Sequence, residues 1–303
     1  MSLAALKSAV QAGQYQTARW LFVQVLDDPS LSRGDMAAAY CEASVAEYRA
    51  GHLHTAIAWS KMAAGLASEM GQVQLLSRVS QNLIEFLRLS GETAAAIDTG
   101  LRWLASYADN PEVAFRTGRI YYNLALTYRQ REETDKALTF YEKAWQHLEQ
   151  VHKTHPDPAE RERSVVAEVM SLQNAAWLLY EVGRNKQADE VVRKAKALLP
   201  VGDRVLALEQ DLLDALRAHK AGDAEAVLAM VRRAFSSATS IPELQLFWLY
   251  WLAAHALLQQ GKPGIASAYA TMATQAAEDT KNGRLIGLAH DLEKETIVVS
   301  SKS

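Results

Sequence analysis

Residues 121–144 read YYNLALTYRQREETDKALTFYEKA, and this stretch decides the fold. It contains two apolar stripes at helical spacing, which consist of Tyr121, Leu124, Ala125 and Tyr128, and then of Ala137, Tyr141 and Ala144. At about 100° per residue, each stripe covers one side of a helix. Small residues at Ala125 and Ala137 let two helix backbones approach closely, and tyrosines fill the space beside them. The stretch therefore predicts a helix, a short polar turn and a second helix packed on the first.

The same arrangement recurs along the whole chain. Its turns are predicted at Gly13, Gly51, Gly91, Glu132, Gly183, Gly222 and Gly261. Their successive spacings are 38, 40, 41, 51, 39 and 39 residues, so one unit has about 40 residues. The single long interval places some ten extra residues around 152–156, where the flanking helices are expected to be longer. Fourteen helices in seven pairs follow.

A second clear unit supports this pattern. Its small and bulky positions are Leu172, Ala175, Ala176, Leu179, Gly183, Ala188, Val192, Ala195 and the closing Pro200. This order of small and bulky residues resembles the tetratricopeptide repeat (TPR) family, and the resemblance extends over nearly the whole chain. Val227 departs from it where the second helix normally begins with Ala, and Ser60 and Gly100 replace the usual aromatic residue. Units of about 40 residues, longer than the usual 34 or so, are similar to those of bacterial regulatory TPR proteins.

The resemblance implies an all-α, right-handed superhelical solenoid of about seven helix-turn-helix pairs. An apolar stretch from Leu285 to Leu292 predicts a C-terminal helix that covers the end of the stack. We expect one domain over residues 1–297 and a disordered tail over 298–303. Helix starts are predicted at residues with capping side chains, which are Asn110, Asp157, Asp203 and Ser240.

Composition limits the possible functions. The chain has 303 residues, of which 49% are hydrophobic and 22% charged, and about one in six is alanine, a strong helix former. A net charge of -3 provides no basic field for nucleic acid, and no apolar run is long enough to span a membrane. Cys41 is the only cysteine, which excludes a disulfide framework and predicts a half-buried structural residue. The start of the chain lacks the features of a signal peptide, so a cytoplasmic protein is expected.

A second stripe on the first helix of each central unit is the candidate binding surface. In the TPR family, which the chain resembles, this stripe lines the concave groove. Across three units it contains Arg78, Gln81, Glu85 and Arg88, then Arg119, Tyr122, Leu126 and Arg129, then Met170, Gln173, Trp177 and Tyr180. Planar arginines at a recurring spacing can bind carboxylates or phosphates through paired hydrogen bonds. The alternative is a solvated face in which Glu85, Glu132 and Glu181 neutralise the arginines.

Asparagines recur beside this stripe at Asn82, Asn123 and Asn174. An amide both donates and accepts hydrogen bonds, so a row of amides can hold the backbone of an extended peptide. Asparagines do this in the peptide-receptor relatives that the chain resembles. The alternative is a local structural role. The last unit has its own stripe at Trp248, Trp251, His255 and Leu258, which is either a partner anchor or packing beside the terminal helix.

Catalysis has little support in the sequence. His147, His152 and His155 lie near Asp157, but a catalytic metal would need a third firm ligand and a placed base. Residues 261–264 lack the ending of a phosphate-binding loop. We therefore expect a non-enzymatic protein without a cofactor that binds a protein or an extended peptide in its groove, with acidic groups facing the arginines. The alternative is a receptor that responds to a signal peptide and acts through a separate output protein.

Overall fold

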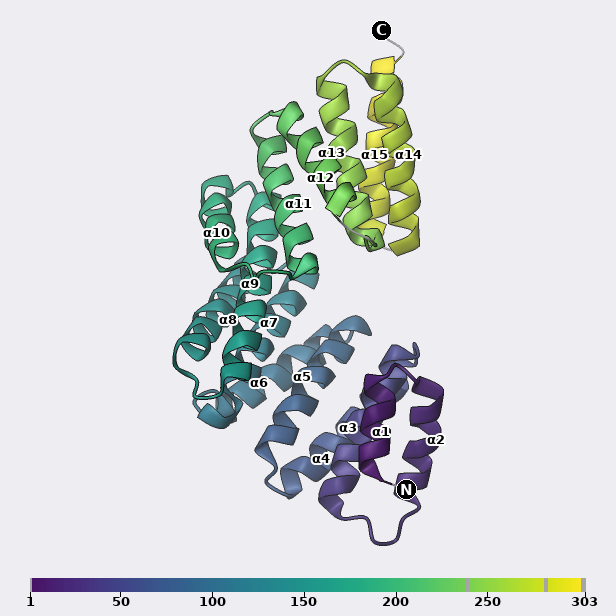
Figure 1. Ribbon diagram of the computed structural model, residues 1–303, viewed down its shortest axis with the longest axis vertical. Coiled ribbons are helices and arrows are strands. Elements are labelled where there is room, and N and C mark those ends of the chain that lie inside the picture. The colour runs from purple at the N-terminus through teal and green to yellow at the C-terminus, as the bar shows by residue number, and fades with distance from the viewer. Residues whose placement is uncertain (1, 238–239, 281–282, 301–303) are drawn as a thin grey trace. The chain divides into compact units, whose positions relative to one another are not determined.

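The computed structural model describes residues 2–237, 240–280 and 283–300. Within these ranges every regular element is helical (Figure 1). The bounds are α1 (Leu3–Gln11), α2 (Tyr15–Leu26), α3 (Arg33–Arg49), α4 (Leu53–Glu69), α5 (Val73–Leu89), α6 (Thr93–Tyr107), η1 (Pro111–Val113), α7 (Ala114–Gln130), α8 (Thr134–Thr154), α9 (Pro158–Glu181), α10 (Asn185–Leu198), α11 (Arg204–Lys220), α12 (Ala224–Ser237), α13 (Glu243–Gln259), α14 (Pro263–Thr280) and α15 (Gly283–Ser300). The predicted all-α fold of seven helix pairs and a terminal helix is confirmed. The two helices beside the long interval, α8 and α9, are indeed longer than the others.

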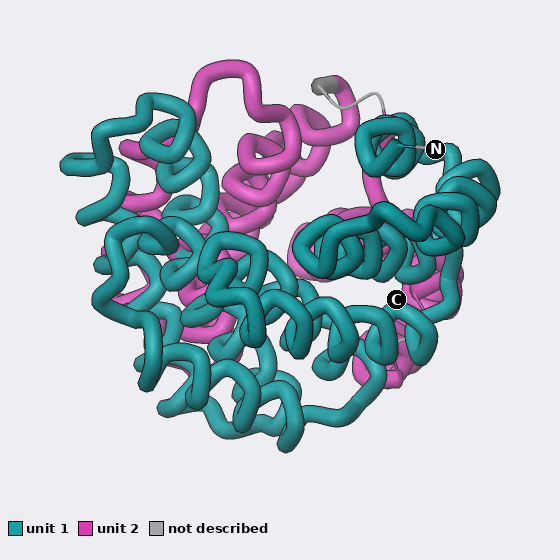
Figure 2. Tube along the Cα trace, turned by 90° about the horizontal axis from the view of Figure 1, so that it is seen from below, with its two compact units in different colours: residues 1–171 teal, residues 172–303 magenta. Residues whose placement is uncertain are grey.

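The chain divides into two compact units, residues 1–171 and 172–303 (Figure 2). The division falls inside α9, which is continuous from Pro158 to Glu181. The expectation of a single domain over residues 1–297 stays a prediction. Helix α15 continues to Ser300, so residues 298–300 of the expected disordered tail are helical, because Leu292 and Thr296 keep this helix packed. Residues 301–303 lie outside the described residues.

Each helix pair turns in the same way. The six glycines predicted at the turns all have a positive φ, between 68° and 87°. Glu132 takes the seventh position with a φ of 61°, although this region normally favours glycine. Its turn makes the same backbone hydrogen bonds as the others: Glu132 N–H donates to Arg129 and Glu133 N–H donates to Tyr128. The repeat spacing therefore predicted the position of a turn that has no glycine.

Side-chain caps start several helices as predicted. The Asp203 carboxylate accepts from the backbone N–H groups of Val205 and Leu206, and Asp157 Oδ1 accepts from Ala159 N–H at 2.9 Å. The cap predicted at Ser240 is wrong. Helix α13 begins at Glu243, and its N-cap Pro242 makes no side-chain hydrogen bond. Proline sets an extended backbone before the helix at this point, and Ser240 lies too early in the chain to reach it.

Small residues set the contact between neighbouring helices, both within a pair and between pairs. Ala125, Ala137 and Ala144 are fully buried in the fourth pair. Close packing explains why glycine stands at position 100, where an aromatic residue is usual. A Cβ on Gly100 would lie 2.7 Å from the side chain of Leu124 in the next pair. Gly118 packs in the same way against Leu148. A larger residue at either position would require the facing leucine side chain to move.

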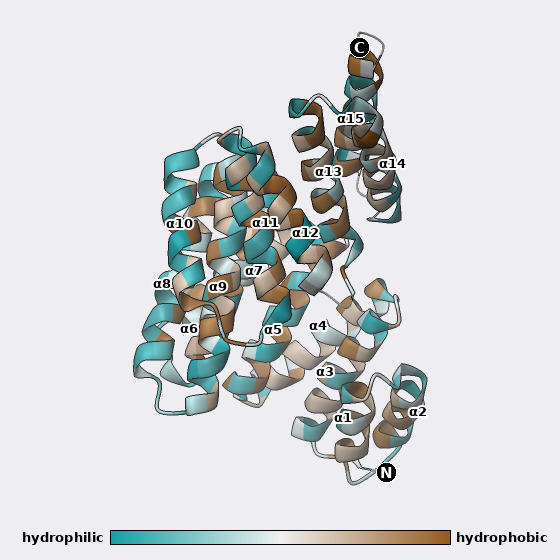
Figure 3. Cartoon of the chain, turned by 45° about the horizontal axis from the view of Figure 1, so that its top comes forward, coloured by the Kyte–Doolittle hydropathy of each residue, from teal (hydrophilic) through white to brown (hydrophobic). Residues whose placement is uncertain are grey.

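The C-terminal core belongs to the second unit. Phe247, Ala254 and Ala273 are buried with Leu285 and Leu292 of the terminal helix. Trp248, Trp251 and Leu258 pack against this cluster, which supports their structural interpretation. Figure 3 shows the resulting contrast: α13 is hydrophobic along most of its length, whereas α10 is largely hydrophilic. No helix among the described residues is both long and apolar enough to cross a membrane.

Candidate functional site

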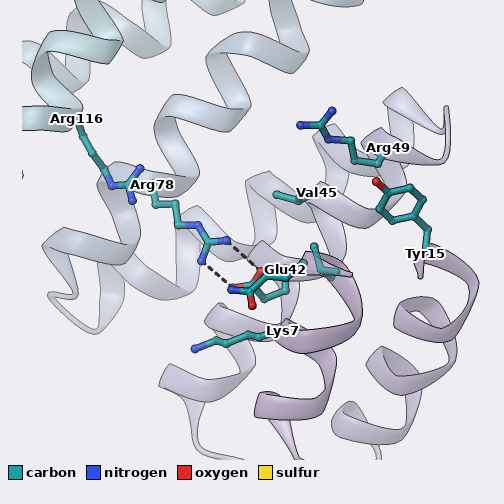
Figure 4. A pocket seen from close by; sticks show the side chains of 9 residues that line it. Lys7, Tyr15, Glu42, Val45, Arg49, Arg78 and Arg116 are labelled. Atoms are coloured by element: carbon teal, nitrogen blue, oxygen red, sulfur yellow. Dashed lines mark hydrogen bonds and ion pairs between the residues drawn. The ribbon is translucent and has the colours of Figure 1, made fainter. Parts of the chain in front are cut away.

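A pocket of about 500 Å³ lies on the first helices of the pairs in the first unit (Figure 4). Helices α1, α3, α5 and α7 each contribute side chains, and α2 closes one side. The lining residues are Lys7, Val10, Gln11, Tyr15, Glu42, Val45, Arg49, Arg78 and Arg116. Four of them are cationic and one is anionic. The pocket is therefore a place where an anionic group would be favoured. We call it the cationic pocket.

Arg78 forms the rigid centre of the cationic pocket. Its two terminal nitrogens bind the two oxygens of Glu42 at 2.7 and 3.0 Å. The Glu42 side chain is 5% exposed, so the pair holds a carboxylate that is almost fully buried. Burial alone would lower the pKa of Arg78, but its hydrogen bonds to Glu42, together with the negative charges of Glu42 and Cys41, outweigh this effect and raise the pKa. The only carboxylate in the lining is thus already neutralised.

The other three cations have no such partner. No carboxylate of the described residues lies within ion-pair distance of Lys7, Arg49 or Arg116. Arg116 donates to the side-chain oxygen of Gln81 at 3.1 Å, which fixes its guanidinium group. Burial lowers the pKa of Arg116, and the nearby positive charge of Arg78 lowers it further. Figure 4 shows Arg78 between Arg116 and Glu42, so two guanidinium groups lie in succession along the pocket.

Arg119, predicted as a contact for acidic groups, lies elsewhere on α7. Its guanidinium group lies 5.2 Å from the ring centroid of Tyr122 and 3.7 Å from the sulfur of Met170. Tyr122 is 7% exposed and its ring is 6.0 Å from that of Tyr141. These contacts hold Arg119 over an aromatic surface, where cation–π attraction fixes its position.

Arg88 and Arg129 lie near the buried Tyr141. Burial raises the pKa of this tyrosine, and Tyr122 adds to the shift while the two arginines oppose it. The predicted row of arginines is thus split. Arg78 lines the cationic pocket, whereas Arg88 and Arg129 lie around a buried hydroxyl group.

The predicted asparagines have different environments. Asn123 is 2% exposed, and its amide donates to the backbone oxygen of Gln81 at 3.2 Å. This hydrogen bond ties α7 to α5. Asn82 and Asn174 are half-buried. A role for all three in holding a peptide backbone stays a prediction.

The other predicted residues of the second unit are engaged in packing. The Gln173 amide donates to the backbone oxygen of Leu206 at 2.9 Å, and the Tyr180 hydroxyl donates to Asp189 at 2.6 Å. Burial raises the pKa of Tyr180, and the Asp189 carboxylate raises it further. Trp177 is 6% exposed, with its ring 5.0 Å from that of Trp248. These contacts join α9 to α10, α11 and α13.

The partners assumed for the arginines need correction. Arg78 binds Glu42 from the preceding pair rather than Glu85. Glu181 pairs with Arg284 of the terminal helix at 3.5 Å. The correct partners come from other helices, which spacing within one helix does not show.

The three histidines near residue 150 each have a different hydrogen-bond partner. His147 Nε2 lies 2.9 Å from the backbone oxygen of Ala114, and His152 Nδ1 lies 2.8 Å from Glu168. His155 Nδ1 accepts from the Asp157 backbone. The described residues contain no group of three His, Cys, Asp or Glu side chains placed to hold a metal ion.

Lys7, Arg49 and Arg116 were missed by the sequence analysis. The signal was present in the spacing: Glu42, Val45 and Arg49 follow the same i, i+3, i+7 pattern as the predicted stripe. Arg116 lies three residues before Arg119 on the same helix. The predicted stripes lie in the central units and the last unit, whereas the cationic pocket begins with the first pair.

Comparison with solved structures supports the fold. The apo form of RapI has a TM-score of 0.64 at 15% identity and covers 92% of this chain and 93% of its own. A tetratricopeptide repeat protein from Parabacteroides merdae gives 0.59 at 16% identity, covering 97% of both chains. The apo form of the quorum sensor NprR from B. thuringiensis gives 0.58 at 11% identity, covering 98% of this chain and 86% of its own. No family model and no curated protein matches the sequence. The chain has the fold of the tetratricopeptide repeat proteins, as its repeat pattern predicts.

Proposed function

We propose that the chain is a non-enzymatic module that binds an acidic protein segment or an extended peptide on the first helices of its pairs. The observation that carries this proposal is the cationic pocket, in which Lys7, Arg49 and Arg116 have no carboxylate partner among the described residues. Like charges held close together repel each other, and an incoming carboxylate relieves that repulsion. Charge-assisted hydrogen bonds would then fix the ligand.

The site is largely formed before the ligand arrives. The Arg78–Glu42 pair and the Arg116–Gln81 hydrogen bond hold two guanidinium groups in place. Because fewer side chains must become ordered on binding, less affinity is lost to conformational entropy. Arg119, Arg129 and the half-buried Asn82 would extend the contact along α5 and α7 of the first unit.

Binding of labelled peptides tests the proposal. Fluorescence anisotropy would compare a pool of aspartate-rich peptides with a pool of lysine-rich peptides of equal length. We expect the acidic pool to bind, and the Lys7→Glu/Arg49→Glu variant to lose that binding. Lys61→Glu/Lys143→Glu is the matched control, because it makes the same change in net charge at exposed residues of α4 and α8. Equal binding by both variants would show that the pocket is not the site.

A second function, a regulatory receptor for a signal peptide, rests on a different observation. The chain consists of two compact units that share the continuous helix α9. A peptide that binds one unit could alter how the chain presents the other to an output protein. The resemblance of the fold to the quorum sensor NprR supports the same idea. Small-angle scattering with and without a bound peptide separates the two functions, since an unchanged profile favours a passive binding module.

A further inference from the structure

Three cations of the cationic pocket converge on one place. Lys7, Arg78 and Arg116 come from α1, α5 and α7, and all three line the pocket. Figure 4 shows Arg116 and Lys7 on either side of the Arg78 guanidinium group. Burial raises the pKa of the Cys41 thiol, and the positive charges of all three residues oppose that rise, so they act on one common atom. We call these three residues the cation triad.

The charges around the cation triad do not balance. Among the described residues that line the pocket, Glu42 is the only carboxylate, and it is paired with Arg78 at 2.7 Å. Glu160 also acts on the charge of Arg116, but it is already paired with Arg163 at 3.1 Å. The other two members of the triad therefore leave two positive charges uncompensated. One ligand carboxylate would neutralise half of this excess, whereas a phosphoryl ester, with a charge of about −1.5 to −2 at pH 7, would neutralise most of it.

The cation triad also offers hydrogen-bond donors from three directions. Arg78 uses its two terminal nitrogens on Glu42, which leaves its Nε–H group. Arg116 uses one terminal nitrogen on the Gln81 side chain, which leaves the other and its Nε–H group. Lys7 contributes an ammonium group on an exposed side chain. A phosphoryl group has three terminal oxygens in a tetrahedral arrangement, one for each member of the triad, whereas a carboxylate has two oxygens in one plane.

We infer that the anionic group bound at the cation triad is the phosphoryl group of a phosphorylated peptide. This inference rests on the proposed function and names the chemical class of its ligand. The triad is open to such a group, since Lys7 is exposed, the Arg78 side chain is 36% exposed and Arg116 is half-buried. Figure 4 shows Arg49 apart from the triad, where it stays available for an acidic side chain of the same peptide.

Arg116 gains most from a dianionic ligand. Burial lowers the pKa of its guanidinium group, and the positive charge of Arg78 lowers it further. A half-buried cation beside a second cation is unfavourable, and an anion between them turns a repulsion into two attractions. The attraction grows with the charge of the anion, so the phosphoryl dianion is favoured over a carboxylate.

Four pools of labelled peptides provide the test. Each pool has two aspartates, varied uncharged neighbours and one fixed position that is phosphoserine, sulfoserine, aspartate or serine. Sulfoserine has the tetrahedral shape of phosphoserine but only one negative charge, so it separates charge from shape. In fluorescence anisotropy, we expect wild type to bind the phosphoserine pool about tenfold tighter than the sulfoserine and aspartate pools, which is the effect of one more charge-assisted hydrogen bond.

The pools also separate this inference from the proposed function. Equal affinities for the phosphoserine pool and either monoanionic pool would overturn the inference but leave the proposed function standing. A failure of every pool to bind wild type would overturn both.

Substitutions locate the phosphoryl group. We expect Lys7→Gln and Arg116→Gln each to lower the ratio of the phosphoserine affinity to the aspartate affinity, and Lys7→Arg to keep it. A loss of folded protein would lower both affinities together and leave their ratio unchanged. Lys61→Gln is the matched control, because it removes an exposed cation of α4 outside the pocket, and it should keep the wild-type ratio. An unchanged ratio in both Lys7→Gln and Arg116→Gln would overturn the inference.

Inorganic phosphate distinguishes a phosphorylated peptide from a free phosphate ion. It offers the same oxygens to the cation triad but lacks the contacts of the peptide with Arg49 and the rest of the pocket. We expect inorganic phosphate at the concentration of the phosphoserine pool to leave the anisotropy unchanged. Displacement of the pool at equal concentration would overturn the assignment to a peptide.

Discussion

The two units use the corresponding face of their helix pairs in opposite ways. In the first unit, α1, α3, α5 and α7 surround an open pocket with cationic side chains. In the second unit, tryptophan and histidine rings of α11 and α13 cover the corresponding face. Trp251 lies 4.0 Å from His255 and 5.3 Å from His219, and Trp248 lies 5.8 Å from Trp251, measured between ring centroids.

The difference has an energetic basis. Aromatic rings gain free energy when they are buried against one another, whereas guanidinium and ammonium groups lose hydration. The first unit leaves Lys7 and Arg49 exposed and pairs Arg78 with the buried Glu42, whereas the second covers the corresponding face with partly buried rings. One repeat scaffold thus carries charged side chains on this face in one unit and packed rings in the other. This contrast predicts that substitutions in the second unit change stability, while pocket substitutions in the first unit change binding.

The largest loss of stability is expected when Trp177 is replaced. Replacement by alanine removes a ring that is 6% exposed and packs on Trp248. We expect Trp177→Ala to lower the free energy of unfolding by about 3–5 kcal/mol in urea denaturation. Trp20→Ala is the control, because Trp20 is 53% exposed in the first unit, and its cost should stay within about 0.5 kcal/mol. Similar costs at the two positions would remove the contrast between the faces.

Acid should destabilise the second unit. Burial lowers the pKa of both His219 and His255 from 6.5 to about 4, and the nearby His255 contributes to the shift of His219. The unfolded chain takes up these protons first as the pH falls, so stability is intact above about pH 6.5 and is lost between 6.5 and 4. We expect a loss of about 2–4 kcal/mol for the pair after allowance for solvent screening.

Histidine variants show whether His219 and His255 cause this loss of stability in acid. His219→Gln/His255→Gln should flatten the dependence of the urea midpoint on pH between 6.5 and 4. His290→Gln removes an exposed histidine of the same unit and should leave the dependence unchanged. A wild-type midpoint that did not move with pH in this window would show that the two histidines are not buried as neutral groups.

A smaller effect is expected for the ion pair in the first unit. Arg78→Ala leaves the buried Glu42 without its guanidinium partner, which should cost about 1–3 kcal/mol because Arg78 itself is partly exposed. The double variant Arg78→Ala/Glu42→Ala should recover part of that loss. If it were no more stable than Arg78→Ala, the cost would come from lost packing rather than from an unpaired carboxylate.

The smallest effect concerns the turn without glycine. Glu132 has a φ of 61°, where a side chain is strained. Glu132→Gly should therefore stabilise the first unit by about 0.5–1 kcal/mol, less than the full strain because glycine also loses more freedom on folding. Thermal unfolding measures the gain, and Gly51→Ala at the corresponding turn should shift the midpoint in the opposite direction. A destabilising Glu132→Gly would show that the Glu132 side chain makes a contact worth more than the strain.

The fold was predictable because its signals are local and repeated. The turn spacing identified even Glu132, and the small residues at Ala125 and Ala137 identified which helix faces meet. The cap of α13 was not predictable in the same way, since Ser240 and Pro242 compete for one helix start and the local sequence does not decide between them.

The candidate site was only partly predictable. Arg78 was identified by its stripe, but its partner Glu42 belongs to another helix pair. Asn123 and Gln173 bind backbone oxygens of other helices, and the repeat pattern does not distinguish such a bond from one to a ligand. Charge in the pockets depends on which side chains converge from several helices, and this requires the packed structure.

The burial of Cys41 has a practical consequence for measuring motion. This sole thiol is fully buried, and burial raises its pKa to about 11, so it reacts slowly with maleimide reagents at neutral pH. A protein with His54→Cys in the first unit and Lys262→Cys in the second would therefore carry two reactive thiols at exposed positions, beside turns that point away from the cores. A donor and an acceptor dye attached there would report by energy transfer whether a bound peptide changes the separation of the two units, without any need to remove the native cysteine.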